Sequence, residues 1–153
     1  MSSILVCIDF SQGTDRLLAT ASQLAREVQA SLILFHAVEL TPAYIPLGPA
    51  MDVVAPPMVE LITTDSSLQE KKLAELAKLP LLSDILVDFS VVIGSPVEEI
   101  LEKALTNEPR FIMVGSHGHG ALHHLFSGSV VNGVLRQSQW PVVVVPVHPP
   151  KLD

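Results

Sequence analysis

Five short apolar runs, rich in valine and isoleucine, recur along this chain and constrain its fold more than any other feature. They span residues 4–8, 31–38, 86–93, 111–114 and 140–147. The first of them, residues 4–8, is continuously apolar, which is typical of a strand buried on both faces of a sheet. We therefore expect a parallel sheet covered by helices.

Segments with helical periodicity separate these runs. The first has its apolar residues at Leu17, Leu18, Ala21, Leu24, Ala25 and Val28. A second helix is expected from about Met58 to Leu79, with a less regular apolar stripe. Ser95-Pro96-Val97-Glu98 forms a capping box with proline at the first helical position, and we expect the third helix to end at Asn107–Pro109. Its predicted buried face is Val97, Ile100, Leu101, Ala104 and Leu105. A fourth helix is expected after residue 127, with apolar positions that include Val130, Val131, Val134 and Leu135.

Strands and helices thus alternate strictly, which predicts an α/β fold: an open five-stranded parallel sheet, Rossmann-like, with helices on both faces. The 153 residues are the length of one ordinary domain, so we expect a single domain over residues 1–153. The segment 39–57 is the exception to the regular pattern. Its five prolines exclude a regular helix, and the sequence leaves its conformation open.

Charge and cysteine content narrow the class of function. The formal net charge is −7 and the nine basic residues are scattered, which disfavours binding to nucleic acid or to anionic membranes. No run is long enough to cross a bilayer and no signal peptide is evident, so we expect a cytoplasmic protein. Cys7 is the single cysteine and is expected to be a small core residue.

In an open parallel sheet, ligands bind outside the carboxyl ends of the strands. Asp9, Val38, Gly94 and Gly115 stand at those ends. Asp9 is equally well explained as a turn or helix-capping residue, and it needs a partner to form a site. The loop beginning at Gly115 is that candidate partner, because glycines let backbone amides approach a phosphate. Glycines are also common in plain turns, and that alternative stays open.

The spacing within this loop resembles a known signature. Gly115, two residues, Gly118, nine residues, Gly128 and then Ser129 is similar to the nucleotide-binding motif of the universal stress protein family. The resemblance also includes residues 4–11, Gly94-Ser95-Pro96 and residues 141–146, and so covers nearly the whole chain.

This resemblance implies a stress-response regulatory protein that binds ATP or AMP, with a sheet in the order 3-2-1-4-5. By position, Asp9 would hold the ribose and adenosine side, Val38 and Val114 would flank the adenine, and Gly115 would contact the ribose. The residues implied to surround the phosphates are Gly118, Gly128, Ser129 and Val130.

The chain departs from the family pattern on the phosphate side. Val131 stands where many nucleotide-binding members have a hydroxyl residue, and no lysine or arginine occurs between Phe111 and Leu135. A triphosphate would then depend on backbone amides, the helix dipole, Mg²⁺ or the loop histidines, of which His117 and His119 are candidates on the phosphate side. The four loop histidines match no metal motif, so no metal site is expected; a solvated loop or a pH-sensing role are the alternatives. His36 and His148 are expected to be structural or exposed.

The final valine-rich run would lie at a sheet edge, where it invites pairing. The family pairs this strand with its copy, so we expect a homodimer through Pro141–Val147. Two other functions remain open: a nucleotide-free dimeric interaction module acting through Glu39–Pro57, and a slow ATP hydrolase using Asp9 or the loop histidines as base. No residue is assigned a catalytic role.

Overall fold

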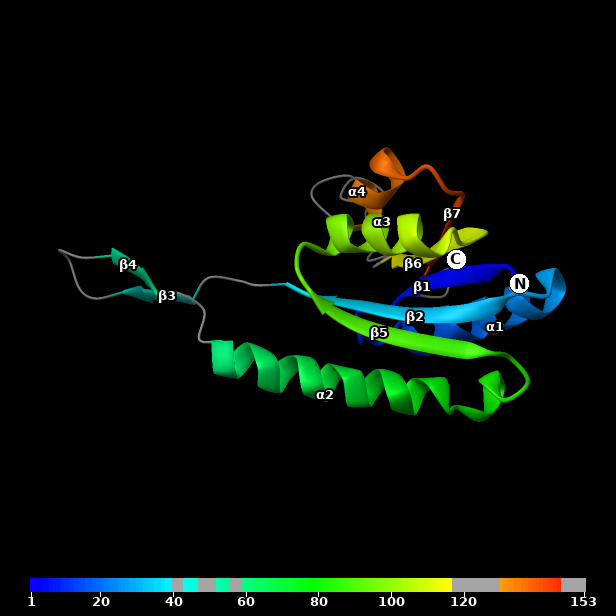
Figure 1. The fold of residues 1–153 in the computed structure, drawn as a ribbon, viewed down its shortest axis with the longest axis horizontal. Coiled ribbons are helices and arrows are strands. Elements are labelled where there is room, and N and C mark those ends of the chain that lie inside the picture. The colour runs from blue at the N-terminus through cyan, green and yellow to red at the C-terminus, as the bar shows by residue number, and fades with distance from the viewer. Residues whose placement is uncertain (40–42, 47–51, 56–58, 117–129, 147–153) are drawn as a thin grey trace, which may run out of the picture.

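The fold is built around a parallel five-stranded sheet in the order β5-β2-β1-β6-β7 (Figure 1). A computed structural model describes residues 1–39, 43–46, 52–55, 59–116 and 130–146 of the chain. The sheet strands are β1 (Ser3–Cys7), β2 (Ser31–Val38), β5 (Val87–Ile93), β6 (Phe111–Ser116) and β7 (Val142–Pro146). Counted along the chain, this is the order 3-2-1-4-5, so the expected Rossmann-like α/β fold is confirmed.

Helices cover both faces of the sheet. α1 (Thr14–Val28) and α2 (Val59–Ala77) lie on one face, and α3 (Pro96–Asn107) and α4 (Val130–Gln137) lie on the other (Figure 1). Successive residues of a strand point to opposite faces. Ile4 and Val6 of β1 accordingly pack with α1, whereas Leu5 packs with α3 and α4.

α3 begins at the predicted residue, but the predicted hydrogen bond from the capping side chain is not made. The helix begins at Pro96 after Ser95, and the amide of Glu99 donates to the Ser95 carbonyl at 2.9 Å. The Ser95 side chain makes no capping hydrogen bond, so the predicted capping box is wrong. The extended backbone of Ser95 and the fixed φ of Pro96 are enough to begin the helix.

Leu105, which was predicted to be buried, is exposed instead, and so is Leu135, an apolar position of the fourth helix. Leu105 of α3 is 68% exposed and Leu135 of α4 is 46% exposed. Each follows a fully buried residue, Ala104 or Val134, and successive residues of an α-helix are rotated by about 100°. The faces that pack on the sheet are therefore narrower than the apolar pattern suggested.

The segment that the prolines exclude from a helix contains an antiparallel hairpin. β3 (Ala43–Pro46) pairs with β4 (Asp52–Ala55), from Ala43 opposite Ala55 to Pro46 opposite Asp52. In Figure 1 this hairpin lies well away from the central sheet. The strict alternation predicted from the sequence is therefore interrupted by two additional strands.

A salt bridge ties α1 to the chain that precedes β5. Arg26, in the last turn of α1, donates to both carboxylate oxygens of Asp84 at 2.8 Å and to the Leu81 carbonyl at 2.6 Å. Leu81 belongs to a single 3₁₀ turn, Pro80–Leu82, that follows α2.

In the part of the chain that the structure describes, no helix is both long and apolar enough to cross a membrane.

Candidate functional site

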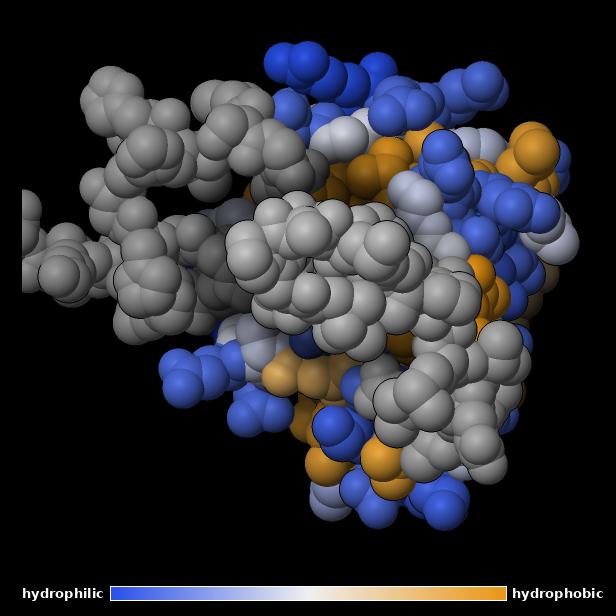
Figure 2. All heavy atoms as spheres, turned by 90° about the vertical axis from the view of Figure 1, so that its left-hand side faces the viewer, coloured by the Kyte–Doolittle hydropathy of each residue, from blue (hydrophilic) through white to orange (hydrophobic). Residues whose placement is uncertain are grey.

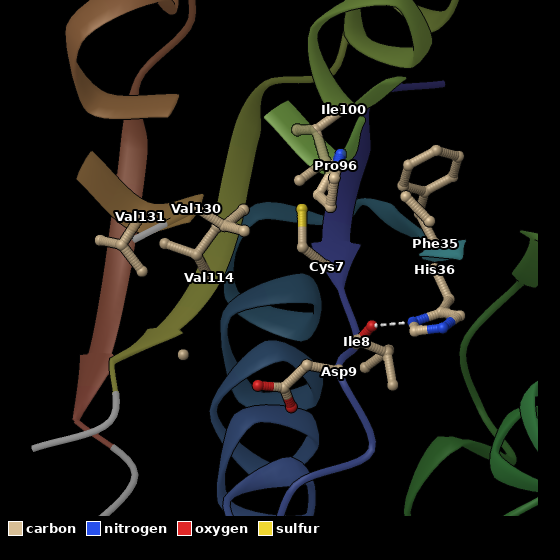
Figure 3. Close-up of a pocket in the computed structure, with 12 residues that line it drawn as sticks. Cys7, Ile8, Asp9, Phe35, His36, Pro96, Ile100, Val114, Val130 and Val131 are labelled. Carbon is tan, nitrogen blue, oxygen red and sulfur yellow. Dashed lines mark hydrogen bonds between the residues drawn. The ribbon is translucent and has the colours of Figure 1, made fainter. Parts of the chain in front are cut away.

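A pocket of about 360 Å³ lies where the parallel strands end, between the sheet and the first residues of α3 and α4 (Figure 3). Pockets for small ligands begin at about this size. The residues that line it come from five elements and the turn after β1: Cys7, Ile8, Asp9, Phe35, His36, Ala37, Pro96, Ile100, Val114, Gly115, Val130 and Val131. Figure 2 views this end of the molecule and shows apolar side chains interspersed among polar ones on this face.

Four of the residues singled out in the sequence meet at this pocket. Asp9, Val114, Gly115 and Val130 all line it, although more than 100 positions separate Asp9 from the other three. Parallel pairing of β1 with β6 places Cys7 beside Val114, which brings the ends of these strands together. Val38 does not line the pocket; it pairs with Ile93, and its carbonyl accepts the Gly94 amide at 3.0 Å.

The remaining predicted residues lie outside the described part of the chain. These are His117, Gly118, His119, Gly128 and Ser129. Their segment begins after Ser116, at the end of β6, and finishes where α4 starts at Val130. The predictions for the phosphate side therefore remain predictions.

The walls of the pocket are mainly apolar. Phe35, Ile100 and Val114 are each at least 97% buried, and they contribute side chains from β2, α3 and β6. Among the described lining residues, Asp9 is the only acidic one and none is lysine or arginine. Such a pocket suits a flat, largely uncharged ring system that a few polar groups orient.

Cys7 is part of the pocket wall rather than of the closed core. In Figure 3 its sulfur lies between Pro96 and Ile100 on one side and Val114 and Val130 on the other. Removal from water raises the pKa of the Cys7 thiol from 9.0 to about 12. The thiol is therefore neutral at physiological pH and is a contact surface, not a nucleophile.

Asp9 begins a tightly hydrogen-bonded turn between β1 and α1. The Ser11 amide donates to Asp9 Oδ1 at 3.0 Å, and the Thr14 amide donates to the Ser11 carbonyl at 3.1 Å. Phe10, between Asp9 and Ser11, has a φ of 57°, which lies in the left-handed region that bulky residues rarely adopt. Asp9 is thus a turn residue and a pocket residue at once, while the capping position of α1 belongs to Gly13.

His36 is a pocket residue that the sequence did not identify. Its Nδ1 lies 2.7 Å from the Ile8 carbonyl, and because a carbonyl can only accept, Nδ1 carries the proton. The Phe10 ring meets the His36 ring edge to face, with centroids 4.8 Å apart. The available signal was its place, since His36 is the polar residue near the carboxyl end of an otherwise apolar strand.

Metal ligation has no support among the described residues, where no three histidine, cysteine or acidic side chains are grouped to hold an ion. Val131 of α4 also lines the pocket, and its aliphatic side chain offers no hydrogen bond there. The described site therefore offers apolar contact, one carboxylate and one imidazole.

Comparison with known proteins identifies a family model and a relative that match nearly the whole sequence. The family model described as the universal stress protein family matches residues 1–146. A universal stress protein of Thermus aquaticus is 31% identical over 146 residues, covering 94% of this chain and 97% of its own length.

Two solved structures share the fold. A universal stress protein in complex with cAMP is 22% identical with a TM-score of 0.61, over 96% of this chain and 98% of its own. One from Archaeoglobus fulgidus in complex with dAMP is 16% identical with a TM-score of 0.58, over 95% and 98%. With the family model matching nearly its full length, this chain belongs to the universal stress protein family.

Proposed function

We propose that this pocket binds an adenine nucleotide and that the chain is a nucleotide-responsive regulatory protein of the stress response. The observation that carries the proposal is the convergence of Asp9, Val114, Gly115 and Val130 on one pocket at the carboxyl ends of β1 and β6. It gains support from the two structural neighbours in complex with cAMP and with dAMP, since both ligands contain adenine.

The described residues fit the nucleoside half of such a ligand. Apolar side chains from Phe35, Ile100 and Val114 provide surfaces on which an adenine ring would pack. The Asp9 carboxylate, at the mouth of the pocket, would accept hydrogen bonds from ribose hydroxyls or from the exocyclic amine. Gly115 has no side chain and would let the sugar approach the backbone.

On the phosphate side, the proposal rests on the sequence. Gly118, Gly128 and Ser129 would bind the phosphates through backbone amides and one hydroxyl, next to the amino end of α4. Because no lysine or arginine occurs between Phe111 and Leu135, we propose a monophosphate such as AMP as the preferred ligand, with ATP requiring Mg²⁺. His117 and His119 would add donors at that end.

The test is to purify the chain without added nucleotide, denature it and identify any released small molecule by chromatography and mass spectrometry. Thermal unfolding with AMP, cAMP and ATP, each with and without Mg²⁺, measures the preference. A ligand present at about a hundred times its dissociation constant should add about 2.7 kcal/mol of stability. No released nucleotide together with no stabilisation by any of them would refute the proposal.

A substitution in the glycine signature tests the phosphate side separately. Gly118→Val should abolish stabilisation by AMP while leaving the ligand-free melting temperature within a few degrees. Lys151→Val, near the end of the chain and outside the signature, is the control and should bind normally. Equal AMP binding by both variants would exclude the glycine signature from the site.

The hairpin favours a second candidate, a protein interaction module. An isolated two-stranded hairpin is marginally stable in water, and β3-β4 lies apart from the central sheet in Figure 1. If this candidate is correct, no adenine nucleotide stabilises the chain, and a variant in which residues 43–55 are replaced by a short glycine-serine linker loses binding to a protein partner while it stays folded.

A further inference from the structure

One side chain, His36, contacts both neighbours of Asp9: the backbone carbonyl of Ile8 before it and the side-chain ring of Phe10 after it. We infer that His36, together with Phe10, is a positioning residue that fixes the Asp9 carboxylate at the mouth of the pocket before any ligand arrives. This inference rests on the proposed function, because it gives the positioned carboxylate a ligand to receive.

The first contact is to the peptide group that precedes Asp9. The carbonyl of Ile8 belongs to the Ile8–Asp9 peptide bond, and His36 Nδ1 donates to it at 2.7 Å. The amide of the same residue, Ile8, donates to the Phe35 carbonyl at 2.8 Å. Both hydrogen bonds come from consecutive residues of β2, so the end of β1 is attached to its neighbour up to the residue before Asp9.

The second contact is to the residue that follows Asp9. The Phe10 ring packs edge to face on the His36 ring, 4.8 Å between centroids and inclined by 62°. Lys72 Nζ of α2 lies 5.4 Å from the centre of the Phe10 ring, within the range of a cation–π interaction. Phe10 is therefore held between a strand and a helix that are far from it in sequence.

The backbone of Phe10 gives the reason why such support is needed. Its φ of 57° is unfavourable for a bulky residue, and conformations of this kind persist only where the surroundings impose them. With Phe10 in this conformation, the chain turns so that the Ser11 amide reaches Asp9 Oδ1 at 3.0 Å. One carboxylate oxygen is thus engaged by the turn, and Asp9 is kept on the pocket side of it.

The contacts of His36 lie outside the ring surfaces proposed for adenine, which distinguishes positioning from direct binding. Phe35 and Ala37, its neighbours in β2, pack on the α3 and α4 side of the sheet, whereas Phe10 packs with the core on the α1 and α2 side. In Figure 3 the dashed line from His36 runs to the Ile8 oxygen, beside Asp9. His36 would then affect a ligand through Asp9.

The test compares His36→Leu with His36→Asn. Asparagine places an amide donor near the position of Nδ1, whereas leucine keeps the bulk and has no donor. We expect hydrogen exchange of the Ser11 amide to be slow in the wild-type chain, fast in His36→Leu and intermediate in His36→Asn, which restores the hydrogen bond to the Ile8 carbonyl but not the ring contact with Phe10. Affinity for AMP, measured by calorimetry, should fall about tenfold in His36→Leu, the loss expected for one hydrogen bond to a charged group, and recover in part in His36→Asn.

A double-mutant cycle with Asp9 separates positioning from general destabilisation. If His36 acts through Asp9, His36→Leu should weaken AMP binding in the wild-type background and have no further effect in an Asp9→Ala background. Equal losses in both backgrounds, or an unchanged Ser11 amide in His36→Leu, would overturn the inference. If the wild-type chain binds no AMP, the proposed function fails, and the Ser11 amide alone then decides whether His36 holds the turn.

Discussion

Burial in the pocket wall makes the Cys7 thiol a weaker acid than a thiol in water. Its pKa of about 12, against 9.0 in the absence of burial, means roughly a thousandfold less thiolate at neutral pH. We predict that iodoacetamide modifies Cys7 at least about a hundredfold more slowly in the native chain than in the urea-unfolded chain at pH 8. Mass spectrometry at timed intervals measures both rates, and equal rates would contradict an apolar environment for the thiol.

Individual site residues were predictable where a local pattern marked them. Asp9 and Gly115 follow apolar runs and were identified from their neighbours in sequence, whereas Val130 was implied by the resemblance to the family. His36 was not, because its significance depends on the pairing of β1 with β2, which places Cys7 beside Phe35. Local sequence carries no record of that register, nor of the left-handed conformation of Phe10.

At the scale of elements, α3 and α4 pack closely because residue 133 is a glycine. An alanine Cβ at that position would lie 2.6 Å from Val97 Cγ2. We predict that Gly133→Ala destabilises the chain by about 1 kcal/mol in urea unfolding, because overpacking of about 1–3 kcal/mol exceeds the gain in helix propensity of about 1 kcal/mol.

The matching experiment removes the clash from the other side. In a Val97→Ala background, Gly133→Ala should become neutral or stabilising, because the methyl groups of Val97 are gone. Destabilisation of the same size in both backgrounds would place the strain elsewhere. Since Val130 and Val131 of α4 line the pocket, the single variant should also bind AMP more weakly.

The link between α1 and the turn before β5 predicts a dependence on pH. Hydrogen bonding to the Arg26 guanidinium lowers the pKa of Asp84 from 3.8 to about 2. The carboxylate is favoured in the folded state, so its stabilisation is complete above about pH 5 and is lost as pH falls through about 2. Its size is limited because the two side chains are 44% and 57% exposed.

The measurement is urea unfolding of the wild-type chain and of Asp84→Asn between pH 2 and pH 6. The difference in unfolding free energy should be constant above about pH 5 and shrink at lower pH. A difference that grows as pH falls would show that the pair does not act as described.

Strands and helices were predictable where their own residues mark them, and not where they depend on contacts with distant residues. β2 matches the predicted range Ser31–Val38, since most of its residues are apolar and the chain on either side of them is not. The hairpin β3-β4 was missed because prolines exclude a helix but not an extended chain. Its strands pair across the intervening residues, and no local pattern in the sequence indicates that pairing. Leu105 was misassigned because an apolar residue can sit at the edge of a helical face and remain exposed.

For the whole molecule, the sheet ends in an edge strand, β7, with Val144 36% exposed. We predict that two chains pair through this strand, since exposed apolar edges are rarely left uncovered. Equilibrium sedimentation should give a dimer for the wild-type chain and a monomer for Val144→Lys. Leu105→Lys, at an exposed leucine on α3, is the control and should remain dimeric; a monomeric wild-type chain would contradict this prediction.

The central claim, that the pocket at the strand ends binds an adenine nucleotide, is tested most directly by calorimetric titration of AMP into three forms of the protein. Cys7→Ala leaves the pocket open, whereas Cys7→Leu places a larger side chain where the Cys7 sulfur faces Ile100 and Val114. We predict saturable binding of one AMP per chain by the wild type and by Cys7→Ala, and at least about tenfold weaker binding by Cys7→Leu. No binding by the wild type, or equal binding by all three forms, would contradict it.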